Sequence, residues 1–458
     1  MSRRHGFRRI LIANRGEIAA RVIRTCRRLG IETVLTVSDA DAGALPARLA
    51  DATIRIGPAP AAASYLDVTA VVGAALAAGA DAVHPGYGFL SENPRLARAC
   101  ADAGVAFIGP AAGTLEAAGD KLAAREHAAA AGLPVLPGAE VNAVGVSELA
   151  AGIGYPVLVK AAGGGGGRGL RVVRDPADLA HAVAVAGAEA AAAFGDPRVY
   201  LERYVSRGRH VEVQILGDGE RVIHLGDRDC SVQRRYQKLI EEAPAPLLGD
   251  DLRDRLHAAA VALGERLGYR GAGTVEFLID AEHDNFYFLE VNARIQVEHP
   301  VTEAVTGLDL IAEQIAIAEA RPLRLRQEDV AIRGHAIECR INAEDPAAGF
   351  LPSPGTITNA VFPSGVRVDT HVQAGSAVPP HYDSLLAKVI GHGADRGEAL
   401  ATLRGALDRC AVDGVVTNLD MHRGLLADAE FGKGGVDTGY LGRFLESAAY
   451  VQENHGSA

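Results

Sequence analysis

One ten-residue segment, residues 290–299, constrains the fold more than any other part of this chain. It alternates polar and apolar side chains from Glu290 to Glu298. In a β-strand, neighbouring side chains point to opposite faces of the sheet. One face would therefore enter a core and the other would carry a row of charged and amide groups. The apolar positions are Val291, Ala293, Ile295 and Val297, and the polar positions are Glu290, Asn292, Arg294, Gln296 and Glu298.

A half-buried strand with a solvated polar face is the ordinary explanation of such alternation. Two observations argue against it. The polar row has no Thr, Lys or Ser, which solvated and edge strands favour. In addition, Glu276 lies in a preceding strand-like run, residues 273–279, and a hairpin would bring it beside Glu290 or Asn292. Two adjacent carboxylates need a cation or a raised pKa, and Mg²⁺ with phosphate oxygens is the usual solution. We therefore predict a metal and anion site.

A second informative segment is residues 155–173, where a β-branched run ends at Lys160, glycines fill positions 163–169 around Arg168, and another apolar run follows. This order predicts a hairpin with a glycine-rich tip, whose backbone can approach phosphate oxygens closely. It matches neither the P-loop nor the dinucleotide-binding pattern. A glycine run is otherwise most often a flexible linker, but the two flanking strands favour a mobile phosphate lid.

Composition limits the class of protein. A chain of 458 residues holds about three domains. Its net charge of −11 argues against nucleic-acid or anionic-membrane partners. The five cysteines form no Cys-x-x-Cys pair, which fits a reduced, cytoplasmic setting. We expect neither a secretory signal nor a membrane span, since no apolar stretch is long enough.

The order of expected elements is that of an α/β protein at the N-terminus. We expect strands at 9–13, 33–37, 81–84 and 105–108, and helices at 17–29, closed by Gly30, and at 64–76. Strand–helix alternation predicts a parallel sheet. The first turn is not a dinucleotide fingerprint, which argues against NAD. Further strands are expected at 198–205, 210–214, 334–341 and 384–390, with a polar segment at 227–238 and a final helical region.

Seven blocks then stand in a recognisable order: Ala13-Asn-Arg-Gly-Glu-Ile-Ala, His84-Pro-Gly-Tyr-Gly-Phe-Leu-Ser-Glu-Asn, Lys160 with its glycines, Arg228-Asp-Cys-Ser-Val-Gln-Arg-Arg, Glu241-Glu-Ala-Pro-Ala-Pro, Glu290-Val-Asn-Ala-Arg-Ile-Gln-Val-Glu-His-Pro and Glu338-Cys-Arg-Ile-Asn-Ala-Glu-Asp-Pro. On these blocks the chain resembles the biotin carboxylases of the ATP-grasp superfamily. The resemblance implies an α/β N-terminal parallel-sheet domain (1–118), a central ATP-grasp α+β domain (119–325, lid about 134–205) and a C-terminal α+β domain (326–450).

The same resemblance implies a reaction and a set of site residues. ATP phosphorylates bicarbonate, the resulting carboxyphosphate gives CO₂ and phosphate, and biotin N1 takes up the CO₂. Mg²⁺ or Mn²⁺ would be held by Glu276, Glu290 and Asn292. The expected nucleotide contacts are Lys121, Lys160, Gly166, Gly167, Glu202, Arg203, Tyr204, Val205, His210, Gln233, Tyr236 and Leu278, together with Glu276 and Glu290.

At the other substrate, Lys238, Arg294, Gln296 and Val297 would hold bicarbonate. Arg294 can fork two donors to a planar anion, which lysine cannot. Glu298 would be the general base, since its ordinary pKa leaves it ionised near neutral pH. Arg340 would stabilise the biotin enolate by electrostatic preorganisation. Arg294, Glu298, Arg340 and Lys238 are thus the expected catalytic residues.

Several of these residues have simpler explanations. Arg340 alone reads equally as an ion-pair arginine, His210 as a packed histidine, and Arg234 and Arg235 as salt-bridge partners. Tyr87 either packs or borders the bicarbonate site. Cys230 is expected to be buried and inert.

Position 236 departs from the family pattern, because Tyr236 stands where we expect His. Tyr donates a hydrogen bond but is not cationic near neutral pH. We therefore predict a modest change in nucleotide affinity and no loss of activity.

The expected partners follow from a missing motif. The biotinylation sequence of this family's partners resembles Ala-Met-Lys-Met, whereas this chain has only Met1 and Met421, the latter followed by His422. We expect a free-standing, homodimeric subunit that serves a separate biotin carrier protein and carboxyltransferase subunits. Acetyl-CoA carboxylase, which supplies fatty acid biosynthesis, is the commonest such assembly; other acyl-CoA, pyruvate and urea carboxylases stay open as alternatives.

Two other classes of protein remain as alternatives. One is an ATP-grasp ligase that passes activated bicarbonate to ammonia or an amine, against which Arg340 and the block from Glu338 argue. The other is a regulatory protein that binds nucleotide without catalysis, against which the intact set of metal and base residues argues.

Overall fold

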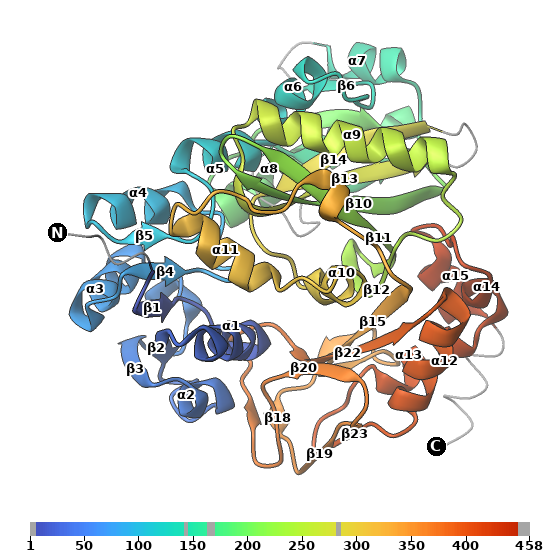
Figure 1. The fold of residues 1–458 in the computed structure, drawn as a ribbon. Helices are drawn as coiled ribbons and strands as arrows, with labels where there is room; N and C mark the ends of the chain where they lie inside the picture. The colour runs from blue at the N-terminus through green and yellow to red at the C-terminus, as the bar shows by residue number, and fades with distance from the viewer. Residues whose placement is uncertain (1–5, 142–144, 163–169, 281–284, 448–458) are drawn as a thin grey trace.

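The chain begins with a parallel sheet that carries helices on its faces. The computed structural model describes residues 6–141, 145–162, 170–280 and 285–447 (Figure 1). The first sheet has the order β3-β2-β1-β4-β5, and every pair in it is parallel. This confirms the predicted α/β start of the chain. Its strands are β1 (Arg9–Ile12), β2 (Glu32–Ser38), β3 (Ala52–Gly57), β4 (Ala82–His84) and β5 (Ala106–Phe107).

The helices of this region are α1 (Gly16–Leu29), α2 (Leu45–Leu49), α3 (Val68–Ala78), α4 (Pro94–Asp102), α5 (Ala112–Gly119) and α6 (Lys121–Ala130). Helix α1 ends where predicted, because Gly30 adopts a left-handed φ of 72°. The helix expected from residue 64 starts four residues later. The Asp67 side chain accepts hydrogen bonds from the backbone of Thr69 and Ala70, and this cap sets the first turn.

The centre of the molecule is an eight-stranded antiparallel sheet with the order β14-β13-β10-β11-β12-β15-β22-β20. It is continuous across residue 325, where the sequence suggests a domain boundary. Helix α9 (Asp250–Arg266) packs over β10 and β11 (Figure 1). The strands are β10 (Gly208–Asp218), β11 (Val222–Arg234), β12 (Gln237–Ala243), β13 (Arg270–Asp280), β14 (Asn285–Asn292), β15 (His335–Asn342), β20 (Arg367–Thr370) and β22 (Leu385–Gly393).

A smaller sheet, β6-β9-β7-β8, carries the predicted glycine hairpin. Strands β7 (Val157–Ala161) and β8 (Arg171–Val173) pair antiparallel, as expected of a hairpin. Its tip, with Gly166 and Gly167, lies outside the described residues. The other elements here are β6 (Gly138–Glu140), β9 (Val199–Arg203), α7 (Val146–Ile153) and α8 (Leu179–Phe194).

Helices pack on the part of the central sheet that β12, β15 and β22 form. Helix α10 (His299–Thr306) packs on one face of β12, β15 and β22, and α12 (Arg396–Leu407) packs against β15 and β22. The remaining elements are α11 (Leu310–Ala318), α13 (Leu419–Ala427), α14 (Ala429–Lys433), α15 (Tyr440–Glu446) and the short ladders β16 (Glu344–Asp345) with β17 (Leu351–Pro352), β18 (Gly355–Thr356) with β21 (Ala377–Val378) and β19 (Asn359–Val361) with β23 (Ala411–Asp413). In the described part of the chain, no helix has the length and apolar character needed to cross a bilayer.

Candidate active site

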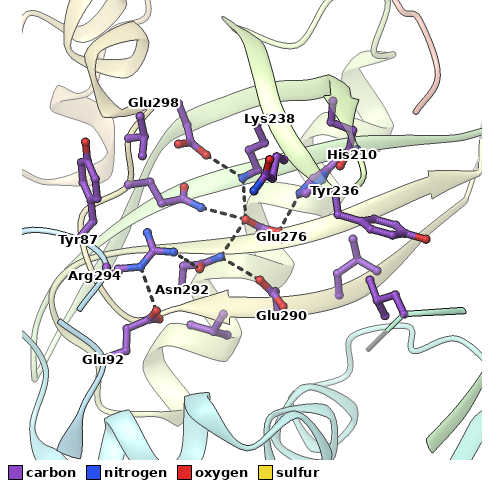
Figure 2. Close-up of a pocket in the computed structure, with 18 of the residues that line it drawn as sticks. Tyr87, Glu92, His210, Tyr236, Lys238, Glu276, Glu290, Asn292, Arg294 and Glu298 are labelled. Atoms are coloured by element: carbon purple, nitrogen blue, oxygen red, sulfur yellow. Dashed lines mark hydrogen bonds and ion pairs between the residues drawn. The ribbon is translucent and has the colours of Figure 1, made fainter. Parts of the chain in front are cut away.

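A single cavity of about 910 Å³ borders every described residue that the sequence predicts for the site. Its walls come from the central sheet, including β15, from the lid sheet (β6-β9-β7-β8) and from the loops of the N-terminal sheet (Figure 2). The predicted residues among its lining are Lys121, Lys160, Glu202, Arg203, Tyr204, Val205, His210, Gln233, Tyr236, Lys238, Glu276, Leu278, Glu290, Asn292, Arg294, Gln296, Val297, Glu298 and Arg340.

The hairpin of β13 and β14 brings the predicted carboxylates together. Glu276 lies directly opposite Glu290 in the register. The Asn292 side-chain amide donates to Glu276 Oε1 at 2.8 Å and to Glu290 Oε1 at 3.5 Å. Glu290 is the most open of the three, and among the described residues it pairs with Lys121, whose Nζ lies 3.8 Å away. This all-oxygen set, with one carboxylate facing the cavity, fits Mg²⁺ or Mn²⁺.

The predicted strand through residues 290–299 is wrong beyond its third residue. Strand β14 ends at Asn292, and α10 starts at His299 with Pro300 in its first turn. The backbone N–H of Ala293 leaves the ladder and donates to Glu92 Oε1 at 3.0 Å. Ala293 and Ile295 are still buried, but Val297 borders the cavity instead of the core. The backbone bends at Arg294 and turns at Val297 and Glu298 before α10 begins, so the alternation of a strand does not extend to Val297.

Lys238 is the centre of the charged part of the cavity. Its ammonium group lies 2.5 Å from Glu212 Oε2, 2.7 Å from Glu276 Oε1 and 2.7 Å from Glu298 Oε1 (Figure 2). Burial lowers the pKa of Lys238, but the three carboxylates outweigh it and hold that pKa well above its usual value. One lysine thus balances carboxylates from β10, from β13 and from the turn before α10.

Glu276 stays ionised although it is buried. Burial raises its pKa, but the charges of Lys238 and His210 hold the pKa well below its ordinary range. His210 Nε2 lies 2.8 Å from Glu276 Oε2. Burial lowers the pKa of His210 and the Glu276 charge raises it, with a net rise. His210 is therefore neither isolated nor simply packed.

Glu298, the predicted general base, lies between two cations. Its Oε1 accepts from Lys238, and its Oε2 accepts from Arg340 Nη2 at 2.8 Å. Burial raises the pKa of Glu298, but Lys238 and Arg340 bring the net value below the ordinary one. Arg340 Nη2 also lies 2.5 Å from Glu241 Oε1. Glu298 is thus ionised near neutral pH, as a base must be at the start of a reaction.

Arg294 is oriented by a residue of the N-terminal region. Its Nε donates to Glu92 Oε2 at 3.0 Å, and its Nη2 donates to Asn292 Oδ1 at 2.7 Å. Gln296 donates to Glu276 Oε1 at 2.9 Å. Arg294 and Tyr87 lie at one end of the view in Figure 2, and Tyr236 lies at the other. The two ends thus offer different chemistry, an anion clamp at one and an aromatic wall at the other.

The lid sheet contributes Lys160, on β7, and the residues at and just after the end of β9 to the wall of the cavity. Lys160 forms an ion pair with Glu202, which also accepts from Arg125 at 3.2 Å. Tyr236 is 45% exposed and has a φ of 68° in the turn between β11 and β12. Arg234, the last residue of β11, donates to the Gly349 backbone carbonyl at 2.5 Å, which is a structural contact but not the salt bridge suggested as its alternative. A half-exposed ring at this turn is free to meet a ligand.

The structure also distinguishes between the alternatives that the sequence left open for Cys230 and for Tyr87. Cys230 is fully buried, and burial raises the pKa of its thiol well above the ordinary value, so it is inert as expected. Tyr87 borders the cavity, and its hydroxyl donates to Glu17.

The sequence did not single out the side chains that hold the predicted ones in place. Arg228 is fully buried and donates to Glu212 at 2.5 Å and to Gln296 Oε1 at 2.5 Å. Glu92 orients Arg294, and Glu212 shares Lys238. Glu212 alternates with Val211 and Val213 in β10, and this was the available signal, whereas Arg228 lies in a polar run between Asp227 and Asp229. Their pairing depends on the register of β10 with β11, which the sequence does not state.

Comparison with known proteins agrees along the whole chain. Three family models match: "Biotin carboxylase, N-terminal domain" over residues 6–115, "Carbamoyl-phosphate synthase L chain, ATP binding domain" over 120–326, and "Biotin carboxylase C-terminal domain" over 338–443. A biotin carboxylase of Pseudomonas aeruginosa is 52% identical over 444 residues, which are 95% of this chain and 98% of that protein. Biotin carboxylase 1 of Bacillus subtilis is 49% identical over 441 residues, which are 95% of this chain and 98% of that protein.

Solved structures agree with the sequence matches. A biotin carboxylase from Campylobacter jejuni, in complex with a β,γ-ATP ligand by its description, superposes with a TM-score of 0.93 at 46% identity, over 96% of this chain and 100% of that one. The biotin carboxylase domain dimer of the 2-oxoglutarate carboxylase from Hydrogenobacter thermophilus, described with MgADP, ADP and bicarbonate, gives 0.92 at 42% identity, over 97% and 99%.

Proposed function

The chain belongs to the biotin carboxylase family, and we propose how the residues of its cavity divide the work of that reaction. The enzyme uses ATP and bicarbonate to carboxylate biotin, which is the first half-reaction of the biotin-dependent carboxylases. The cavity carries this proposal, because it joins a metal and phosphate end to an anion and base end in one space of about 910 Å³.

The nucleotide occupies the end of the cavity between the lid sheet and β13. Lys121, Lys160 and His210 supply positive charge for the phosphates, and the chain from Glu202 to Val205 lines the wall where the base would lie. Glu276, Glu290 and Asn292 hold Mg²⁺ or Mn²⁺, which when bound bridges and neutralises the phosphate oxygens. Gly166 and Gly167 belong to the same proposal from the sequence alone.

Bicarbonate occupies the other end. The Arg294 guanidinium, fixed by Glu92, presents its remaining donors to a planar anion, and the Lys238 ammonium lies beside the same space. Gln296 and Val297 complete the wall. Glu298 removes the bicarbonate proton: each of its oxygens accepts one hydrogen bond from a cation, so lone pairs remain for the proton. The deprotonated anion then attacks the γ-phosphate of ATP and gives carboxyphosphate.

Arg340 serves the second step, in which biotin takes up CO₂. Its guanidinium lies at the cavity wall, with Nη2 between Glu241 and Glu298. A fixed cation at that place stabilises the negative charge that develops on the biotin ureido group without reorganising. An ammonia- or amine-dependent ligase of the ATP-grasp superfamily has no need of such a group, and the C-terminal family match favours the carboxylase as well.

The assignment is tested by measuring ADP release with Mg²⁺ and ATP, first without and then with bicarbonate, and finally with free biotin. We expect bicarbonate-dependent release that biotin stimulates, and its loss in Glu298→Gln. Glu148→Gln, at an exposed position in the first turn of α7, is the control and retains activity. Bicarbonate dependence without any biotin response would instead indicate the carbamoyl-phosphate type of ligase. Absence of ATP turnover in the unaltered chain would revive the alternative of a non-catalytic regulatory protein.

The partners of this chain are proposals that rest on its relatives. We infer a separate biotin carrier protein, carboxyltransferase subunits and a homodimer, with acetyl-CoA as the final acceptor and the cytoplasm as its place. The Pseudomonas aeruginosa relative, a biotin carboxylase by name, is covered over 98% of its length, which supports a biotin carboxylase of this size. The dimer is supported by the Hydrogenobacter thermophilus structure, which its description calls a dimer. Light scattering tests the dimer, and carboxylation assays with acetyl-CoA, pyruvate and urea test the acceptor.

We also place the domain boundaries near residues 118 and 325.

A further inference from the structure

Two buried carboxyls lie directly behind Arg340, and the reaction as described makes no use of their protons. Glu241 on β12 and Glu338 on β15 are partners in the antiparallel register, so their side chains leave the same face of the sheet. Both are 0% exposed. Helix α10 covers this face, and the surroundings are apolar: Ala243, Val301, Val305, Ala336 and Ile390 pack together there.

These two carboxyls lack hydrogen-bond donors. None of their four oxygens has a hydrogen-bond partner among the described residues. Glu241 Oε1 lies 2.5 Å from Arg340 Nη2 as an ion pair, but without hydrogen-bond geometry. Buried polar atoms are seldom left without partners. A proton on one of the two carboxyls would supply the missing donor.

The neighbouring cations are too few to keep both carboxyls ionised. Arg340 already donates to Glu298, and Lys388 already binds Glu17 Oε1 at 3.0 Å and the Val297 carbonyl at 2.8 Å. Two adjacent buried carboxylates cannot both be charged without a dedicated cation. The charged and titratable groups around Glu338 are Glu241 and Lys238 from β12, Arg340 from β15, Lys388 from β22, Glu298 and His299 at the start of α10, and Glu17 from α1 through Lys388.

We propose that Glu241 and Glu338 share one proton near neutral pH and that this protonated pair is a positioning device for Arg340. With one proton, the pair carries a single negative charge, which Arg340 balances while its Nη2 stays between Glu241 and Glu298 at the cavity wall. If the second carboxyl ionised, the buried dianion would draw Arg340 away from the cavity. Burial, which raises the pKa of Glu241 to about 7 and that of Glu338 well above the ordinary value, agrees with Glu338 as the proton carrier.

Kinetics test this inference, which in this assay rests on the proposed role of Arg340. Biotin-stimulated ADP release is measured from acid to alkaline pH for the unaltered enzyme, Glu338→Ala, Glu338→Gln and Glu242→Gln. Glu242 is the matched control, since it is a buried neighbour on the opposite face of β12 that pairs with Arg396 and His335. We expect Glu338→Ala to lower kcat by roughly tenfold or more with little change in the KM for ATP, and Glu338→Gln to restore most of that loss, because the amide replaces the donor.

The pH profile separates positioning from a merely structural role. Ionisation of the second carboxyl gives the unaltered enzyme an alkaline decline in kcat. Glu338→Gln cannot make the dianion, so its decline moves up by at least about one pH unit, a tenfold difference in the equilibrium. Glu242→Gln keeps the alkaline decline of the unaltered enzyme. An unshifted profile in Glu338→Gln, or a Gln variant as inactive as the Ala variant, would overturn the inference.

A second readout does not depend on activity. The infrared carbonyl band of a protonated carboxylic acid is recorded near pH 8, where ordinary carboxyls are ionised. The unaltered chain should show a band that Glu338→Gln lacks and Glu242→Gln retains. If the band is identical in all three proteins, Glu338 carries no proton and the inference fails even where biotin carboxylation is established. If the band behaves as expected but biotin does not stimulate ATP turnover, the proposed function fails and the shared proton stands.

Discussion

Replacing Lys238 with Met is the perturbation that tests the electrostatics of the cavity most directly. Lys238 is the one cation that contacts Glu212, Glu276 and Glu298 at once among the described residues. Without it, Glu298 keeps its contact with Arg340, while Glu212 and Glu276 each lose one of two positively charged partners and keep Arg228 and His210, respectively. The pKa of Glu298 should then rise, because the positive charge of Lys238 is gone. At mildly acidic pH, Glu298 should be protonated and unable to act as the base.

The size of this effect follows from the contact distance. Unit charges 2.7 Å apart interact with ~6 kcal/mol at an effective dielectric constant of 20. Solvent entering the space left by the side chain screens part of this energy. We expect the pKa of Glu298 to rise by at least about two units, which corresponds to ~3 kcal/mol. In the unaltered protein, this pKa lies below its ordinary value, so the stability that it contributes is present at neutral pH and is lost as the pH falls through the folded-state pKa.

The assay is the pH dependence of kcat/KM for bicarbonate-dependent ADP release, with rates expressed per bicarbonate ion. The unaltered enzyme should show no decline from Glu298 at mildly acidic pH, whereas Lys238→Met should be slow and should gain rate as the pH rises through the new pKa. Lys238→Arg keeps the charge and should keep the acid limb of the unaltered enzyme, although bicarbonate binding suffers. Lys433→Met removes an exposed lysine of α14 and should change nothing. An acid limb in Lys238→Met that overlays that of the unaltered enzyme would refute the reasoning.

Three further outcomes are expected. Tyr236→His should change the KM for ATP by about two- to tenfold, the worth of one hydrogen bond, and leave kcat unchanged; an unchanged KM would mean that the ring at this turn does not contact the nucleotide. Arg228→Met should lower the free energy of unfolding by about 3–5 kcal/mol in denaturant titration, because it leaves Glu212 buried without one of its two cations, whereas Arg326→Met, at a 63% exposed side chain, should cost almost nothing. Glu290→Gln should weaken the Mg²⁺ dependence of nucleotide binding by at least about tenfold, as seen by calorimetry, without a change in melting temperature, since Glu290 has few partners in the protein.

The sequence predicted the parts of the site that lie on single strands or on one hairpin. Side-chain alternation in β13 and β14 was enough to predict Glu276 beside Glu290 or Asn292, because the face of a strand follows from residue parity alone. The register of the hairpin then selects Glu290. The glycine hairpin was predicted for the same reason, since its two strands are neighbours in the chain. The error beyond Asn292 came from outside the segment: Glu92, about 200 residues earlier, captures the backbone of Ala293 and ends the ladder. Because the strand did not continue, side-chain parity no longer placed Val297, which borders the cavity.

Contacts between distant strands could not be predicted. In the sequence, Arg228 is one more charged residue in the polar run that starts at Asp227, and only the register of β10, β11 and β13 shows that it holds Glu212 and Gln296. The Glu241–Glu338 pair has the same origin, since β12 and β15 are separated by about 95 residues and become neighbours only in the sheet. Like charges in direct opposition are unfavourable on a strand pair. No rule of local sequence would therefore have paired them.

The central sheet links Glu298, the proposed base, to Arg340, the proposed enolate-stabilising residue. Glu298 is held by Lys238 from β12 and by Arg340 from β15, and these two strands are direct neighbours. A shift of β15 relative to β12 would therefore move Arg340 and remove a counter-ion of Glu298 in the same event. The charge on the base and the place of the cation at the biotin end are thus set by one strand pairing. Substitutions that loosen the pairing of β12 with β15 should slow both bicarbonate deprotonation and biotin carboxylation. Substitutions at Glu290 or Tyr236 should change nucleotide binding alone.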